Sequence, residues 1–261
     1  MRVLCLHGPN QSGKVFQEQL DAVVSVVQDT EKDVSFEFVD APIHCAGSSS
    51  DGQAVYKFFE APIIAAFSTA REWLTRKLTT DGPYDGVIGF SQGATLLSSY
   101  MLYRQWYDYE DPTPFKFAIF ISGSLSLVVL KSLGVLVPVA AERVVEETEL
   151  RRQAGLGPFS PHVSLARQAM FNSDECFGLN LNSVPLELKI RIPTIHVWGV
   201  DDPSFPTSVH LAGLCDPYIR KIYTHSGAHE IPQEAGDTQE VGQLFLWCMQ
   251  RATWPGHSQV Q

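Results

Sequence analysis

The sequence predicts an α/β fold with a mostly parallel central sheet and flanking helices. Short apolar runs bounded by turn residues alternate with segments whose apolar residues recur at helical spacing. This alternation is typical of parallel strands joined by crossover helices. The chain has 261 residues, of which 44% are hydrophobic, so it can bury the core of such a fold. We expect a single domain over residues 1–261.

Six apolar runs are expected to be strands: residues 3–6, 36–39, 86–88, 117–121, 194–198 and 221–224. Helical spacing is found in segments between and after them. The apolar positions of these helices are Phe16, Leu20, Val23 and Val27, then Ile63, Phe67, Leu74 and Leu78, and finally Val241, Leu244, Phe245 and Cys248. Such stripes face a core, so we give them no functional role.

Residues 125–188 break this rhythm. An apolar run is followed by a charged run over 142–152 and by Gly-Pro turns over 155–161. An insertion after a strand of a parallel sheet lies over the carboxyl edge, where ligands bind, so we expect a lid or pocket wall. The apolar run at 125–137 either covers a long hydrophobic chain or forms a buried element without ligand contact, because periodicity does not separate the two.

Charge and cysteine content exclude several classes of partner. The net charge of −10 would repel the backbone of a nucleic acid. The five cysteines are scattered and never spaced as a metal-binding pair, which argues against a disulfide framework and against a zinc site. We therefore expect no nucleic-acid partner, no metal, and a reducing, cytoplasmic setting.

The sequence also gives no sign of membrane insertion or export. The N-terminus enters the first strand without the apolar region of a secretory signal. The most apolar stretch, 125–141, is interrupted by Lys131, Gly134 and Pro138 and is shorter than the roughly 20 apolar residues that a spanning helix needs. We expect no membrane partner.

The strongest chemical signal is the segment 89–93, which reads Gly-Phe-Ser-Gln-Gly. It is a G-x-S-x-G motif that directly follows an apolar strand and directly precedes a helical pattern. Small residues on both sides of the serine permit a tight strand-to-helix turn that exposes the hydroxyl, and the helix N-terminus favours negative charge nearby. Ser91 is therefore the predicted nucleophile.

A serine hydroxyl is a weak nucleophile, so Ser91 needs a base and an orienting carboxylate later in the chain. Strand 194–198 leads into Asp201 and Asp202, and strand 221–224 leads into His225 and His229. We prefer Asp202 because it lies three residues beyond the turn glycine, although the sequence leaves Asp201 open. We prefer His229 as the base because His225 still belongs to the end of a strand, where a structural role is more common.

An oxyanion hole requires two donors near the serine. The first is expected to be the backbone N–H of Gln92, and the second should come from the turn after the first strand, at 7–8. Pro9 has no N–H. The expected second donor is therefore Asn10, through its backbone or its side-chain amide, or else the turn has a different geometry.

Several segments together resemble the FSH family of serine hydrolases: 4–8 (LCLHG), 11–13 (QSG), 39–42 (VDAP), 89–93 (GFSQG), 121–123 (ISG), 192–199 (IPTIHVWG) and 227–229 (GAH). The resemblance implies an α/β-hydrolase fold with a lid-like insertion, and Ser91, Asp202 and His229 as catalytic triad. It also implies hydrolysis of an acyl ester or thioester without a cofactor, as in fungal polyketide pathways, where an acyl carrier protein would be the partner. A general carboxylesterase acting on small esters is the alternative.

Two rival functions follow from the same residues. The segment 8–14 satisfies G-x-x-x-x-G-K, the pattern of a nucleotide-binding P-loop. Val15 replaces the Ser or Thr that would bind Mg²⁺, and Pro9 removes a phosphate-binding N–H. A non-catalytic binding protein of the same fold is the second rival, because fold alone does not confer activity.

Docking of an acidic carrier protein would require a local excess of positive charge, because the chain itself is acidic. Two groups of cations are candidates for the entrance of the site: Arg151 with Arg152, or Arg71 and Arg76 with Lys77.

Overall fold

The computed structural model describes residues 1–48, 52, 54–108, 113–157 and 175–253. Six strands form one parallel sheet in the order β2-β1-β5-β6-β7-β8. They are β1 (Arg2–Leu6), β2 (Ser35–Val39), β5 (Gly86–Phe90), β6 (Phe117–Ile121), β7 (Thr194–Gly199) and β8 (Arg220–His225). All six strands expected from the sequence are present, and the expected α/β architecture is confirmed.

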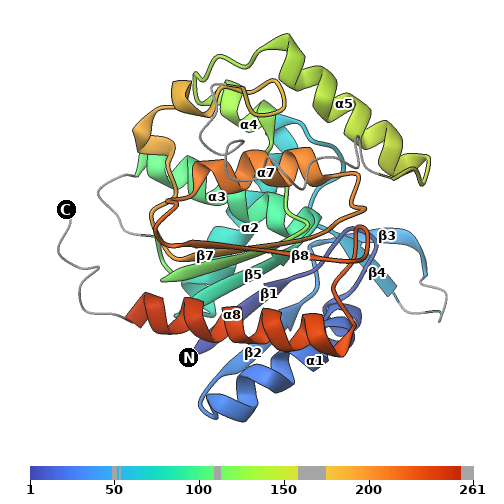
Figure 1. Cartoon of the computed structure of the whole chain (residues 1–261), viewed down its shortest axis with the longest axis vertical. Helices are drawn as coiled ribbons and strands as arrows, with labels where there is room; N and C mark the ends of the chain where they lie inside the picture. Colours follow the sequence, from blue (N-terminus) through green and yellow to red (C-terminus); the bar gives the residue numbers. More distant parts are fainter. Residues whose placement is uncertain (49–51, 53, 109–112, 158–174, 254–261) are drawn as a thin grey trace.

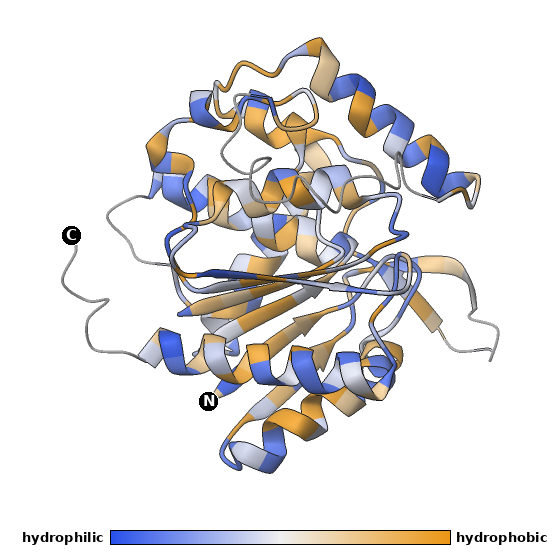
Figure 2. Ribbon diagram, viewed as in Figure 1, coloured by the Kyte–Doolittle hydropathy of each residue, from blue (hydrophilic) through white to orange (hydrophobic). Residues whose placement is uncertain are grey.

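Helices cover both faces of this sheet (Figure 1). One face carries α1 (Gly13–Thr30) and α8 (Ala235–Thr253), and the other carries α2 (Ile64–Thr80), α3 (Gln92–Tyr107) and α7 (Phe205–Leu214). Figure 2 shows apolar residues along the strands between the two helical layers. In β1, Val3 and Cys5 pack with the α1 and α8 side, whereas Leu4 and Leu6 pack with the opposite core. Burial on both faces explains why the four inner strands, β1, β5, β6 and β7, are nearly continuous apolar runs, whereas the edge strands β2 and β8 are more polar and only partly buried.

A small antiparallel hairpin, β3 (Ile43–Ser48) and β4 (Ala54–Lys57), lies outside the main sheet and was not expected from the sequence. Its strands are short and mixed in polarity, so no apolar run marks them. A bridge between Gln11 and Tyr56 joins the hairpin to the turn after β1, with the Tyr56 N–H donating to the Gln11 carbonyl at 2.7 Å. The hairpin therefore supports the turn in which Asn10 lies.

The insertion contains α4 (Leu127–Ser132), α5 (Val139–Gln153) and two short 3₁₀ turns, η2 (Leu181–Ser183) and η3 (Leu186–Leu188). Its apolar run is buried at Leu125, Leu127, Val129, Leu130, Leu133, Val135 and Val137, which belong to the same core cluster as the residues of α2 and α3. None of them lines the cavity at Ser91. These residues of the run are therefore part of a buried element of the core, which is the second of the two interpretations that the sequence left open. Residues 158–174, which include most of the 155–161 turns, lie outside the described part of the chain.

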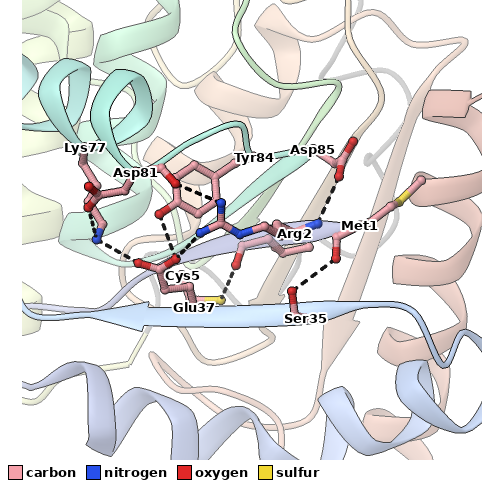
Figure 3. A network of polar contacts seen from close by, with 10 residues as sticks. Met1, Arg2, Cys5, Ser35, Glu37, Lys77, Asp81, Tyr84 and Asp85 are labelled. Atoms are coloured by element: carbon pink, nitrogen blue, oxygen red, sulfur yellow. Dashed lines mark hydrogen bonds and ion pairs between the residues drawn. The ribbon is translucent and has the colours of Figure 1, made fainter.

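The charged residues expected near the entrance are divided between distant places. Arg71 and Arg76 line a separate hollow between α2 and α3, where the Arg71 guanidinium carbon lies 3.2 Å from the centroid of the Tyr103 ring. Lys77 belongs to a network at the amino edge of the sheet, where it binds the Glu37 carboxylate at 2.8 Å (Figure 3). That edge is opposite to Ser91, so only Arg152 of the expected cations borders the site.

None of the helices within the described ranges is long and apolar enough to cross a membrane.

Candidate active site

Ser91 lies in a strained turn between β5 and α3. Its backbone has φ 50° and ψ −109°, and its N–H donates to the Ile121 carbonyl at 2.9 Å. The glycines of the motif are required by close packing. A Cβ at Gly93 would lie 2.3 Å from the Leu6 carbonyl oxygen, and a Cβ at Gly89 would lie 2.5 Å from the backbone of Ala94. The turn places the hydroxyl at the carboxyl edge of the sheet, where ligands bind in parallel α/β folds.

His229 lies between Ser91 and Asp202, in the loop between β8 and α8. Its Nε2 is 2.8 Å from Ser91 Oγ, and its Nδ1 is 3.0 and 3.1 Å from the two Asp202 carboxylate oxygens. A carboxylate only accepts, so Nδ1 carries a proton. In the neutral ring Nε2 then accepts from the serine hydroxyl. The three predicted residues therefore form one hydrogen-bonded chain, although they are distant in sequence.

The structure also separates the two candidate carboxylates. Asp202 is fully buried, and its Oδ1 accepts from the Ser204 N–H at 2.7 Å. Asp201 is exposed, and its backbone N–H donates to the Gly227 carbonyl at 3.0 Å. Only Asp202 reaches His229.

Asp202 is held in its ionised form. Burial alone would raise the pKa of this carboxyl. The hydrogen bond from His229, the positive charge that this ring carries when it is protonated and the Ser204 N–H together lower the pKa below its usual range. The hydroxyl of Ser122, which is buried and makes no hydrogen bond of ordinary geometry, lies close enough to add to this effect. A negative Asp202 can stabilise positive charge that develops on the imidazole.

His225 has a structural role in the loop that carries His229. It is 3% exposed, its Nδ1 accepts from the Gly227 N–H at 3.1 Å, and its carbonyl accepts from the Val200 N–H at 2.8 Å. The bond from Val200 joins the β7–α7 loop to the end of β8, and the bond from Gly227 fixes the turn that leads to His229. The preference for His229 over His225 agrees with this geometry.

Of the two predicted oxyanion donors, Gln92 directly follows Ser91, whereas Asn10 is not among the residues that line the cavity there. Gln92 is the first residue of α3, so its N–H belongs to the unpaired helix terminus. Its side chain faces the segment before α2, because Oε1 accepts from the Phe58 N–H at 2.7 Å and Nε2 donates to the Phe59 carbonyl at 2.9 Å. Asn10 has φ 55°, is exposed, and does not line the cavity at Ser91.

The neighbouring turn is fixed by other groups. The Gly8 N–H donates to Gln11 Oε1 at 3.0 Å. His7 Nδ1 is 2.6 Å from the Gly8 carbonyl, and His7 Nε2 accepts from the Ala41 N–H at 3.0 Å. The Gly8 N–H is therefore already occupied, and His7 supports the turn rather than the reaction.

A cavity of about 360 Å³ opens beside Ser91. It is lined by Pro9, Gln11, Gln19, Phe90, Ser91, Arg152, His229, Glu230, Ile231 and Gln233. Gln19 and Gln233 were not expected at the site from the sequence, whereas Arg152 is one of the cations proposed for its entrance. Arg152 comes from the last turn of α5, where Nε and Nη2 bind the Glu149 carboxylate at 2.9 and 2.7 Å. The insertion therefore does contribute to the pocket wall, through its charged helix.

The P-loop-like segment has other partners. Ser12 caps α1 by accepting from the Val15 N–H at 3.2 Å, and the Gly13 N–H donates to Asp40 Oδ1 at 2.8 Å. A carboxylate thus lies where a P-loop would hold phosphate, and it would repel one. Lys14 is exposed beside Glu18. Within the described ranges no cluster of His, Cys, Asp and Glu could hold a metal ion.

Comparison with known proteins finds fungal esterases that are similar to this chain over most of its length. Similar proteins include Esterase alnB of Emericella nidulans, 26% identical over 100% of this chain and 98% of that protein. Esterase FPY3 of Fusarium mangiferae is 29% identical over 91% of each chain.

Solved structures show the fold alone at this level of identity. The monoacylglycerol lipase of Paleococcus ferrophilus has a TM-score of 0.53 at 13% identity, covering 96% of this chain and 94% of that one. Acyl-protein thioesterase 2 of Zea mays has a TM-score of 0.51 at 16% identity, covering 95% and 93%. The fold is that of the α/β-hydrolases. The family model described as serine hydrolase (FSH1) matches residues 1–241, and the chain therefore belongs to this family of serine hydrolases.

Proposed function

We propose that this protein hydrolyses an acyl ester or thioester, with Ser91 as nucleophile, His229 as general base and Asp202 as the orienting carboxylate. The observation that carries the proposal is the continuous hydrogen-bonded chain from Ser91 Oγ through the imidazole to Asp202. The Ser91 hydroxyl needs a base to take its proton, and His229 lies in that position. His229 in turn needs one tautomer, which the hydrogen bond to Asp202 fixes.

In the first half of the reaction, Ser91 Oγ attacks the acyl carbonyl carbon while its proton moves to His229 Nε2. The tetrahedral intermediate collapses when the carbon–oxygen or carbon–sulfur bond breaks, and His229 returns the proton to the leaving group. In the second half, His229 takes a proton from water, and the resulting attack releases the carboxylic acid and restores the Ser91 hydroxyl. We propose the N–H of Gln92 as one donor to the oxyanion and Asn10 as the second, after a local adjustment of its turn.

The preference for a thioester, and a role in secondary metabolism with an acyl carrier protein as partner, are the finer part of the proposal. They rest on the resemblance to the family and on relatives whose names describe them as esterases or hydrolases of fungi. The general carboxylesterase is the alternative. A comparison of kcat/KM for an acyl thioester, free and carrier-bound, with the oxygen ester of the same acyl group separates the two. A clear preference for the small oxygen ester would favour the carboxylesterase.

Labelling with a fluorophosphonate tests the nucleophile. The wild type should be labelled once, at Ser91, and Ser91→Ala should be neither labelled nor active, with kcat lower by roughly 10³-fold or more. Ser25→Ala, which alters an exposed serine of α1, is the matched control and should behave as the wild type. Labelling at another residue, or near wild-type turnover by a clean preparation of Ser91→Ala, would contradict the assignment.

A further inference from the structure

The cavity beside Ser91 has a largely polar wall. Among the ten described residues that line it, five carry an amide or a charge, namely Gln11, Gln19, Arg152, Glu230 and Gln233. Three of the described lining residues, Pro9, Phe90 and Ile231, are apolar. An alkyl chain placed here would remove water from these polar groups without replacing their hydrogen bonds, which costs free energy.

Hydrogen bonds fix the orientation of the amides. The Gly8 N–H donates to Gln11 Oε1 at 3.0 Å, and Gln11 Nε2 donates to Gln19 Oε1 at 3.1 Å. Gln19 therefore accepts through its oxygen and keeps its Nε2 hydrogens, for which no acceptor is found in the described part of the chain.

The side-chain amide of the third glutamine, Gln233, is fixed through its nitrogen rather than through its oxygen. Gln233 Nε2 donates to the Gln19 carbonyl at 2.8 Å and to the Ile231 carbonyl at 3.2 Å. Both of its hydrogens are thereby occupied, and its Oε1 is left as an acceptor. The wall thus offers one amide donor and one amide acceptor in set positions.

Arg152 adds a charged donor whose charge is already balanced. Glu149 binds the Nε and Nη2 side of the guanidinium at 2.9 and 2.7 Å, which leaves Nη1 without a hydrogen bond to any described residue. Glu149 neutralises the cation, and Glu230 also lines the cavity. These two carboxylates disfavour a negatively charged ligand, while the free N–H groups suit an uncharged oxygen.

We infer that the cavity binds an uncharged, oxygen-bearing segment of the ester substrate, a hydroxyl or a keto group, and that Arg152 and Gln19 determine this specificity by donating hydrogen bonds to it. The inference rests on the proposed function, because it concerns the substrate of the same serine. It replaces the long alkyl chain as the expected ligand class.

Two pairs of esters test the inference on the full-length enzyme. The acyl pair is 4-nitrophenyl butanoate with one oxygenated analogue, either 3-hydroxy or 3-oxo, and the alcohol pair is butyl butanoate with its 3-hydroxybutyl analogue. Each kcat/KM is divided by the rate constant for hydroxide hydrolysis of the same ester, which removes intrinsic reactivity. In at least one pair the oxygenated ester should be preferred by about tenfold, the scale of one or two hydrogen bonds.

Matched variants then identify the residues. Arg152→Met and Gln19→Met should each reduce that preference by about fivefold or more, as expected for the loss of one donor, and Arg152→Lys should restore part of it. Arg151→Met and Gln17→Met alter the same residue types on the same two helices outside the cavity, and should keep the wild-type preference. Thermal unfolding of each variant verifies that it is folded.

Several results would overturn the inference while leaving the serine hydrolase intact. They are equal or better use of the alkyl esters in both pairs, a preference that survives both cavity substitutions, and a stronger preference for 4-nitrophenyl hemisuccinate than for the neutral analogues. Hydrolysis of none of these esters by an enzyme whose Ser91 is labelled by fluorophosphonate would overturn it as well. Failure of the labelling itself would instead contradict the proposed function.

Discussion

Gly199, at the end of β7, packs directly against the backbone of Gly227 in the loop after β8. A Cβ at position 199 would lie 2.1 Å from the Gly227 carbonyl oxygen and 2.2 Å from that of Ala228. This contact sets the spacing between the loop that carries Asp202 and the loop that carries His229. The absence of a side chain at one position therefore determines the geometry of a site formed by others.

We predict that Gly199→Ala lowers both stability and activity. The obstructing atoms are backbone, which cannot rotate away, so the loops must separate. We expect a loss of about 1–3 kcal/mol in the free energy of unfolding, and a fall in kcat of up to about 10²-fold from misplacement of the triad. Urea unfolding and kcat on one ester measure the two effects. Gly236→Ala, where a Cβ would meet nothing within 4 Å, should leave kcat unchanged and should not lower stability, which the smaller unfolded-state entropy of alanine raises by up to about 1 kcal/mol. Wild-type kcat in Gly199→Ala would show that the loops are positioned by other contacts.

The strained backbone of Ser91 predicts a difference between two inactive variants. A non-glycine residue at φ 50° and ψ −109° costs about 1–3 kcal/mol. Replacement by glycine relieves that cost but adds about 0.5–1 kcal/mol of unfolded-state entropy. The relief exceeds the entropy, so Ser91→Gly should unfold at a higher temperature than Ser91→Ala. The opposite order, in differential scanning calorimetry at the same pH, would mean that the turn holds Ser91 without strain.

The two neighbouring aspartates should respond very differently to amidation. Asp202→Asn replaces the buried acceptor of His229 Nδ1–H and favours the wrong tautomer, so we expect kcat to fall by about 10³-fold or more. Asp201→Asn alters an exposed side chain whose residue contributes only a backbone N–H, and it should remain within about twofold of the wild type, as surface substitutions usually do. Equal losses in the two variants would show that Asp202 is not the orienting carboxylate.

Much of this arrangement could be predicted from the sequence because it follows from local patterns. The four inner strands of the sheet are apolar runs, and the two edge strands, β2 and β8, are short segments that contain apolar and aromatic residues. The serine turn is a motif with the correct flanks, and the histidine and carboxylate follow strands whose carboxyl ends must meet at one edge. The position of Asp202, three residues beyond the turn glycine, favoured it over Asp201. In the structure the two carboxylates differ in burial, because Asp202 is buried and Asp201 is exposed.

What the sequence could not provide depends on contacts between distant surfaces. Gln19 and Gln233 look like ordinary solvated residues, and only the packing of α1 beside the loop before α8 brings them together. Arg152 lies in a charged helix whose buried residues are Ala141 and Thr148, so the sequence could propose it only as one of several cations at the entrance. The apolar run at 125–137 was ambiguous because its composition suits a core helix and a ligand cover equally.

The final prediction concerns the network around Glu37 at the amino edge of the sheet. Glu37 accepts from Arg2 Nη2 at 2.9 Å, from Lys77 Nζ at 2.8 Å and from the Tyr84 hydroxyl at 2.9 Å (Figure 3). Burial alone would raise the pKa of this carboxyl, but the bonds from Lys77, Tyr84 and Arg2 lower it below its ordinary value. A carboxyl whose pKa is lower in the folded state stabilises the fold above its unfolded pKa of about 4.3, and this contribution is lost as the pH falls through the folded pKa.

Glu37→Gln should therefore lower the free energy of unfolding at pH 7, and the difference from the wild type should shrink as the pH falls from about 5 to 3, across the range in which carboxyls titrate. Urea unfolding at a series of pH values measures this difference. Glu18→Gln, which alters an exposed carboxylate 3.9 Å from Lys14, is the matched control, and it should show little difference at any pH because exposed ion pairs contribute little. A difference between wild type and Glu37→Gln that stays constant down to pH 3 would mean that Glu37 acts through shape and neutral hydrogen bonding, and that its charge does not stabilise this edge of the sheet.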